Sequence, residues 1–239
     1  MVELKTPFEN KKIGWADVHP TPQFARKDIK SLCGKWALYL GSEFIGDIEV
    51  PFPPESRISG IGRALKAGEK LIYKRCFEMS PENGRVLLHF GAADQIADIT
   101  LNGMSLGTHE GGYLPFVFDI TEHLKEGENT LTVTVTDDLD PDLPYGKQRR
   151  KRGGMWYTPI SGLWQQVWLE RVPENYIRCI RMTPSLAGVE IEVKGGEDEK
   201  ILTLKDGREY RFVGERTFIE IEKPRLWSPS DPYLYEFTL

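Results

Sequence analysis

Aromatic side chains give this sequence its clearest capacity for recognition chemistry. Four of them stand in the stretch Gly153–Glu170, which reads GGMWYTPISGLWQQVWLE, and a fifth lies upstream: Trp156, Tyr157, Trp164, Trp168 and Tyr113. Indole and phenol rings can stack on the apolar faces of sugar rings, but large aromatic side chains also dominate buried cores. Both interpretations stay open on composition, and burial in a core is the commoner outcome.

An acidic run and then a basic run precede this stretch. The acidic run is Asp137, Asp138, Asp140 and Asp142, and the basic run is Lys147, Arg149, Arg150, Lys151 and Arg152. Several carboxylates can bind Ca²⁺, but this spacing lacks the glycine and the terminal glutamate of an EF-hand loop. The basic run lacks the interleaved aromatics of a nucleic-acid site. We therefore expect a solvated loop in which the two runs can face each other.

Sequence motifs for catalysis are absent. The sequence contains no G-x-S-x-G, H-E-x-x-H, P-loop or G-x-G-x-x-G motif. Its histidines lack the spacing of paired metal ligands. His89 falls inside an expected strand, which favours a structural role over a catalytic one. We therefore assign no catalytic residue, no metal ligand and no cofactor to this chain.

Composition and charge are typical of a folded globular protein. The chain has 239 residues, of which 40% are hydrophobic and 11% aromatic. Its net charge of -5 gives no reason to expect a nucleic-acid partner. No apolar run approaches the roughly 18 residues of a membrane span, and the N-terminus lacks the apolar core of a signal peptide. Three widely spaced cysteines, Cys33, Cys76 and Cys179, predict reduced, mostly buried thiols and a cytoplasmic location.

Short segments of alternating hydrophobicity must position these residues. Leu131, Val133 and Val135 alternate with threonines, which is typical of a strand with one buried and one polar face. Similar segments recur between turn residues along the whole chain, and almost nothing has the period of a long helix. The sequence therefore predicts an all-β fold made of sandwiches.

Two domains are expected after an irregular N-terminal segment. The segment comprises residues 1–30, the first β-sandwich residues 31–173 and the second sandwich residues 174–239. The boundary between the sandwiches is placed at Val172–Asn175, where turn residues interrupt the alternation.

The stretch Gly153–Glu170 divides into two parts under this prediction. Its strand is expected at Trp164–Glu170, and the alternation directs Val167 and Leu169 toward the core of the first sandwich. The loop before the strand, Gly153–Ser161, is expected to point outward, where its aromatic residues are available to a partner.

Several motifs occur along the chain in a recognisable order. They are Phe90–Asp94 (FGAAD), Ile99–Gly103 (ITLNG), Gly107–Thr121 (GTHEGGYLPFVFDIT), Gly146–Gln148 (GKQ), Trp156–Glu170 and Leu226–Tyr235 (LWSPSDPYLY). Together they resemble the N-terminal region of glycoside hydrolase family 2, which includes β-galactosidases, β-glucuronidases and β-mannosidases. The resemblance implies a jelly-roll sugar-binding sandwich and then an immunoglobulin-like sandwich. The latter is expected to be incomplete, because a typical immunoglobulin fold has about 100 residues.

The family's catalytic (β/α)8 barrel has no counterpart in this sequence. Such a barrel needs about 250 residues, and the Asn-Glu pair of the family's acid/base residue occurs nowhere here. The resemblance therefore implies the non-catalytic front of a retaining glycosidase, with a catalytic barrel and a carbohydrate substrate as partners. We expect the 239 residues to be inactive alone.

The resemblance also indicates which residues border the barrel's sugar site. In some relatives an acidic residue of the loop before the last jelly-roll strands reaches that site, but Gly153, Gly154 and Met155 stand at the nearest places here. The remaining candidates are Trp156, Tyr157, Tyr113 and Lys147. Two other roles stay open. The chain could be an autonomous carbohydrate-binding module, or a structural domain that packs on a barrel or within a homo-oligomer.

Overall fold

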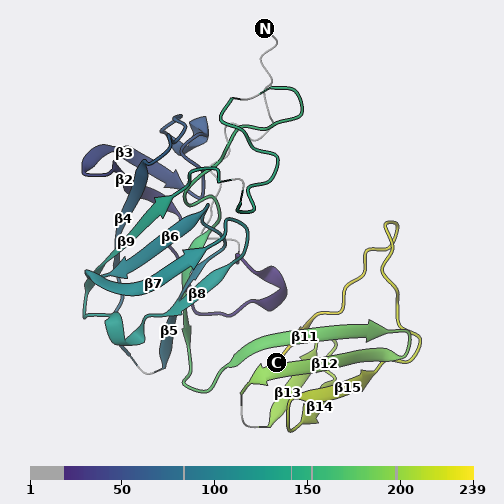
Figure 1. Cartoon of the computed structure of the whole chain (residues 1–239). Helices are drawn as coiled ribbons and strands as arrows, with labels where there is room; N and C mark the ends of the chain where they lie inside the picture. The colour runs from purple at the N-terminus through teal and green to yellow at the C-terminus, as the bar shows by residue number, and fades with distance from the viewer. Residues whose placement is uncertain (1–18, 83, 141, 152, 197–198) are drawn as a thin grey trace. The chain divides into compact units, whose positions relative to one another are not determined.

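The computed structural model describes residues 19–82, 84–140, 142–151, 153–196 and 199–239 (Figure 1). Expectations for residues 1–18 and for the turn at Asn83 lie outside this part. The described strands pair antiparallel throughout, and the helical segments among these residues are short 3-10 turns at Pro22–Phe24 (η2), Arg57–Ser59 (η3) and Thr121–His123 (η4). The predicted all-β class is confirmed. Within the described residues, no helix has the length and hydrophobicity that crossing a membrane requires.

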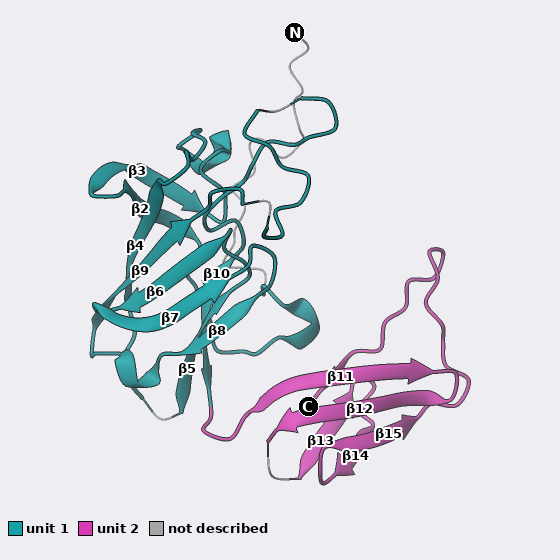
Figure 2. Cartoon of the chain, viewed as in Figure 1, with its two compact units in different colours: residues 1–172 teal, residues 173–239 magenta. Residues whose placement is uncertain are grey.

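Two compact units make up the chain (Figure 2). Unit 1 comprises residues Met1–Val172 and unit 2 comprises residues Pro173–Leu239. Each unit has its own hydrophobic core and is described separately below.

Unit 1 is a sandwich of two antiparallel sheets. The larger sheet has the order β3 (Glu43–Val50), β2 (Gly34–Leu40), β4 (Lys70–Glu78), β9 (Glu128–Thr136), β6 (Ile96–Leu101) and β7 (Met104–Glu110). The smaller sheet has the order β1 (Ile29–Ser31), β10 (Val167–Val172), β5 (Arg85–Phe90) and β8 (Phe116–Asp119). Since β10 pairs with both β1 and β5, the end of the unit lies beside its beginning.

The core of unit 1 lies between these sheets. Leu131 and Val133 of β9 are fully buried, as their alternation with threonines predicts. Val167 and Leu169 of β10 are also fully buried and belong to the same cluster, which confirms the face predicted for them. Each such side chain contributes about 1.5–3 kcal/mol relative to an exposed one. Burial on this scale orients β10 and therefore the loop that leads into it.

The strand β10 is buried on its outer face as well. Trp168 is 4% exposed and stacks on His89 of β5, with 4.8 Å between ring centroids. Glu170 is 2% exposed and pairs with Arg26 of the N-terminal segment. Part of the segment expected to be irregular therefore covers this sheet, and β1 begins inside it at Ile29.

Unit 2 is a smaller pair of antiparallel sheets. One has the order β11 (Ile177–Ser185), β12 (Gly188–Gly195) and β15 (Arg216–Glu220), and the other has the order β14 (Glu209–Phe212), β13 (Lys200–Leu204) and β16 (Phe237–Thr238). Their shared core consists of Ile191, Val193, Leu202, Leu204 and Ile219. The arrangement agrees with the predicted immunoglobulin-like sandwich.

Some elements differ from the sequence prediction. The closing strand begins at Val167 rather than Trp164, because residues 164–166 still belong to the preceding loop. There the Trp164 indole N–H donates to the Gly112 carbonyl. The strand β3 was not predicted, since Gly46 and charged residues interrupt its alternation and only its far end, at Ile48 and Val50, is buried.

The expectation of mostly buried thiols is wrong. Cys76 and Cys179 are exposed and Cys33 is half-buried. Cys76 is exposed because it lies on the outward face of β4, between the inward residues Arg75 and Phe77, with its sulfur 3.7 Å from the Thr130 hydroxyl. All three thiols are free.

Candidate functional site

Trp156 and Tyr157 lie in the long connection between β9 and β10. The guanidinium of Arg149 stacks on the Trp156 ring, 3.9 Å from its centroid, so this indole is partly covered by its own loop. The backbone N–H of Tyr157 donates to the Lys147 carbonyl at 2.8 Å, and the Arg149 N–H donates to the Tyr157 carbonyl at 3.2 Å. These backbone hydrogen bonds join two sides of the loop and place Lys147 beside Tyr157. The Tyr157 side chain remains 67% exposed.

Tyr113 reaches the same loop from a different part of the chain. Its ring packs edge-on against Trp164, and the Trp164 indole N–H donates to the Gly112 carbonyl at 2.9 Å. The Tyr113 hydroxyl accepts from the side-chain amide of Gln148 at 3.3 Å. The Tyr113 side chain is 44% exposed, so it is fixed at one end and open to solvent along its ring.

Gln148 joins these residues, although it was not among the residues predicted to form a site. It is buried, its amide nitrogen donates to Tyr113, and its amide oxygen accepts from the Ile160 N–H at 2.6 Å. Of the predicted candidates, Tyr113 bonds to the Gln148 side chain and Tyr157 lies opposite Gln148 along the backbone, whereas Trp156 contacts Arg149 instead. The only signal for Gln148 in the sequence was its place in the Gly146–Gln148 motif.

The segment Ser161–Leu163 anchors the end of the loop to the sandwich. The Ser161 N–H and hydroxyl both donate to the Glu55 carboxylate, at 3.2 and 2.7 Å. The Gly162 N–H donates to the Asp94 carbonyl at 2.7 Å. The Leu163 N–H lies 3.4 Å from the Tyr73 hydroxyl. Successive N–H groups thus reach acceptors on separate elements, which fixes where the loop ends.

Two glycines permit these close approaches. A Cβ on Gly162 would lie 2.0 Å from the Tyr73 hydroxyl, and its backbone has a φ of +77°, a conformation that L side chains rarely adopt. A Cβ on Gly112 would lie 2.3 Å from the Asp94 carboxylate. Both positions therefore require glycine for physical reasons.

Two buried carboxyls, Asp94 and Asp137, and the half-buried Glu55 lie near the ends of the loop. Burial, followed by the negative charges of Asp137 and Glu55, raises the pKa of Asp94 to about 7. Burial also raises the pKa of Glu55, although Ser161 opposes the shift, and it raises the pKa of Asp137. In the described part of the chain, no His, Cys, Asp and Glu side chains are grouped so that they could hold a metal ion.

The acidic run is less solvated than predicted. Asp137 is buried, and its carboxylate accepts from the Leu139 N–H at 2.8 Å. Asp138 accepts from the Gly68 N–H at 2.7 Å. The expectation that the two runs face each other agrees with the favourable charge of Arg150 near Asp137. These carboxylates accept hydrogen bonds from backbone N–H groups, because the loop folds back against the sandwich.

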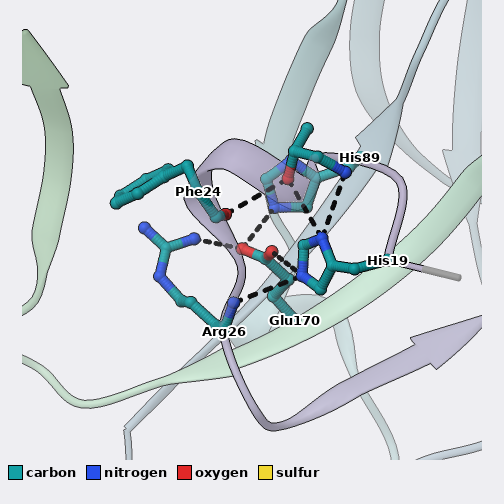
Figure 3. Close-up of polar contacts among 6 residues, drawn as sticks. His19, Phe24, Arg26, His89 and Glu170 are labelled. Carbon is teal, nitrogen blue, oxygen red and sulfur yellow. Dashed lines mark hydrogen bonds and ion pairs between the residues drawn. The ribbon is translucent and has the colours of Figure 1, made fainter. Parts of the chain in front are cut away.

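A second polar cluster ties the N-terminal segment to β10 (Figure 3). Glu170 forms an ion pair with Arg26, and its carboxylate lies 3.2 Å from His89 Nε2 and 3.6 Å from His19 Nε2. Burial acts to raise the pKa of Glu170, but His89 and Arg26 outweigh it and hold that pKa below its ordinary value. Burial lowers the pKa of His19. These contacts join the N-terminal segment to β5 and β10, and the structural role of His89 stays a prediction.

Two family descriptions match the chain. "Glycosyl hydrolase 2 galactose-binding domain-like" matches residues 63–181, and "Glycosyl hydrolases family 2" matches residues 180–239. The two matches overlap at residues 180–181, and together they cover most of unit 1 and all of unit 2.

Curated relatives carry enzyme names. The β-galactosidase of Thermoanaerobacter pseudethanolicus is 28% identical over 196 residues, which are 70% of this chain and 25% of that protein. A β-glucuronidase of Formosa agariphila is 30% identical over 203 residues, which are 69% of this chain and 21% of that protein. The chain thus spans about a quarter of the length of these relatives.

Solved structures share the fold. The β-glucuronidase of Lactobacillus rhamnosus superposes with a TM-score of 0.72 at 25% identity, covering 89% of this chain and 42% of that one. The β-D-glucuronidase of Dictyoglomus thermophilum gives a TM-score of 0.70 at 22% identity, covering 92% of this chain and 42% of that one. The matched part is the N-terminal, non-catalytic region of these enzymes. This chain therefore belongs to glycoside hydrolase family 2, of which it carries the galactose-binding-like domain and part of the immunoglobulin-like domain.

Proposed function

We propose that this chain supports and borders the active site of a family 2 glycosidase barrel and has no hydrolase activity of its own. The observation that carries the proposal is that one hydrogen-bonded loop presents Lys147 and Tyr157, and that Gln148 of the same loop bonds to the Tyr113 hydroxyl. Tyr157 and Tyr113 are 67% and 44% exposed, and exposed aromatic rings with a polar tip are enriched at interfaces. A sugar or a partner domain that covers them would account for their exposure.

A hydrolysis assay tests the proposal that the chain has no activity of its own. The purified chain, incubated with nitrophenyl β-galactoside, β-glucuronide and β-mannoside, is expected to release no nitrophenol above the buffer rate. A retaining mechanism needs two carboxyls roughly 5 Å apart that flank the glycosidic bond. The Asn-Glu pair that contains the family's acid/base residue does not occur in this sequence. Turnover that survives repurification of the chain would contradict the proposal.

The sequence of the gene tests whether a catalytic barrel is the partner of this chain. The reading frame beyond codon 239 is expected to encode a (β/α)8 barrel that contains an Asn-Glu pair. In the joined protein, Tyr157→Ala is expected to raise KM for a disaccharide, while Val117→Ala, at an exposed position on β8, leaves KM unchanged. An unchanged KM in both variants would remove Tyr157 from the site.

The same exposed rings favour a second candidate function, which is carbohydrate binding by the chain alone. Titration with a panel of mono- and disaccharides would then quench tryptophan fluorescence saturably, and Trp156→Ala would weaken the response. The matched control is Trp227→Ala, because Trp227 is 59% exposed and lies in unit 2. A panel without any response would leave only the role beside a barrel.

A further inference from the structure

We propose that Asp94 is a positioning residue whose protonation state controls how firmly residues 145–151 and 153–160 are held on the sandwich. The loop concerned carries Lys147, Trp156 and Tyr157, so the proposal rests on the proposed function for the purpose of the loop. The effect itself, in which ionisation of one carboxyl weakens the attachment of the loop, rests on contacts within unit 1.

Asp94 lies where both ends of the loop are attached. Its own N–H and carbonyl exchange hydrogen bonds with Gly162, at 2.9 and 2.7 Å. Its carboxyl packs against the Cα of Gly112, and the nearby Gln148 side chain acts to lower its pKa. The neighbouring residue Gln95 donates through its side chain to the Pro144 carbonyl at 3.0 Å. Two adjacent residues thus bind the chain just before the loop, at Pro144, and just after it, at Gly162.

The charged groups around Asp94 are mostly of its own sign. Asp137, at the end of β9, and Glu55, before η3, both act to disfavour ionisation of Asp94. Arg150 is the cation on this side, but it faces Asp137 and donates to the Leu65 carbonyl. Among the described residues, no lysine or arginine forms an ion pair with Asp94.

The remaining titratable groups near Asp94 are phenols. The Tyr73 hydroxyl packs against Gly162, and the Tyr113 hydroxyl accepts from Gln148. Burial raises the pKa of Tyr73 to a value at which it stays neutral throughout the working range. Ionised Asp94 is therefore a buried negative charge, at 2% exposure, with two like neighbours and no counterion among the residues that the structure describes.

The sign of the pH effect follows from the raised pKa of Asp94, about 7 in the folded chain against an ordinary 3.8. When the loop opens and exposes Asp94, the carboxyl ionises at its ordinary pKa. Protonation therefore favours the closed loop, whose stability is complete below about pH 4, declines between about pH 4 and pH 7, and stays at its minimum above that. A single proton changes the closing equilibrium by at most about tenfold per pH unit.

Hydrogen–deuterium exchange of the whole chain measures this equilibrium. Peptides from residues 145–163 are followed at about pH 5, 6, 7 and 8, with rates corrected for intrinsic exchange. We expect their protection to fall toward pH 7 and then level off, while peptides of β4 and β9 keep theirs. In Asp94→Asn the decline is expected to flatten, leaving only the smaller contribution of Glu55 and Asp137. Asp98→Asn is the matched control, because Asp98 is an exposed carboxylate on β6.

A second variant separates positioning from a merely structural role. Asp137→Asn removes the neighbouring charge that raises the pKa of Asp94, so it is expected to move the decline in protection to lower pH without abolishing it. If Asp94→Asn disturbed the fold, the β4 and β9 peptides would reveal it, and Asp137→Asn would still decide the question. A decline that is identical in all variants, or absent from the unmodified chain, would overturn the proposal. Sugar binding is measured separately, so failure of the proposed function would leave this result intact.

Discussion

At the scale of single residues, the loop is held by groups that must fit one another closely. Ser161, Gly162 and Leu163 present consecutive N–H groups to Glu55, Asp94 and Tyr73. A buried donor without an acceptor costs about 1–3 kcal/mol of folding free energy. Removing one of these acceptors therefore destabilises the chain by more than the net stabilisation that the hydrogen bond provides. The segment is therefore specified by its acceptors, which come from separate parts of the chain.

Gly162→Ala tests the fit at this point. We expect unit 1 to lose about 3 kcal/mol or more of unfolding free energy, because the added Cβ meets the Tyr73 hydroxyl at 2.0 Å and the φ is +77°. The control is Gly154→Ala, whose φ is +58° but whose Cβ meets nothing within 4 Å, so that only backbone strain of about 1 kcal/mol remains. Urea unfolding followed by fluorescence gives both values. Equal losses would show that the contact with Tyr73 is unimportant.

At the scale of elements, β10 unites the buried core with the site loop. Its inner residues lie in the core, and its outer residues contact His89 and the N-terminal segment. A strand buried on both faces has little freedom to shift, since a slip of one residue would exchange the two faces. The loop before it therefore inherits a fixed attachment point.

Leu169→Ala measures how much β10 contributes. Leu169 is fully buried, so its truncation is expected to cost unit 1 about 2–5 kcal/mol through lost burial and the cavity that remains. Val117→Ala on β8, where the side chain is 51% exposed, is expected to change stability by less than about 0.5 kcal/mol. Chemical denaturation of both variants compares them directly. Similar small losses would mean that this strand is peripheral to the fold.

The N-terminal segment is a second element that depends on β10. Arg26→Ala leaves the buried Glu170 with only histidines as partners, and we expect faster tryptic cleavage after Lys27 together with a loss of about 1–3 kcal/mol. Arg63→Ala removes a more exposed pair with Glu69 and is expected to cost less than about 1 kcal/mol. Cleavage at unchanged rates in Arg26→Ala would show that the ion pair does not hold the segment.

At the scale of the whole chain, two separate cores imply two separable stabilities. Leu202 lies in the core of unit 2, 1% exposed, and Leu202→Ala is expected to cost that unit about 2–5 kcal/mol. Hydrogen exchange should then rise across β11 to β15, while β4 and β9 of unit 1 keep their protection. A matching rise in both units would instead identify a single cooperative fold.

The family's domains follow each other in the order that the motifs predicted, but the site could be predicted only in part. Tyr113, Lys147, Trp156 and Tyr157 were named from aromatic type and motif position, and their role in a site stays a prediction. In the structure, Tyr113 bonds to Gln148 and Tyr157 bonds to the Lys147 carbonyl. Gln148, which bonds to Tyr113 and Ile160, was missed because a glutamine in a polar loop has no distinctive pattern. The aromatic and charged residues indicated a recognition surface, and spatial proximity decided how it is built.

The sequence alone determined that this chain is all-β, because alternation of apolar and polar residues is a local property with a period of two. It also determined the inward face of β10, at Val167 and Leu169, for the same reason. Only the tertiary structure decided that Asp94 meets Gly112, Gln148 and Gly162, since such contacts join residues far apart in the chain. Burial and neighbouring charge, which set the pKa of that carboxyl, exist only once those segments have come together.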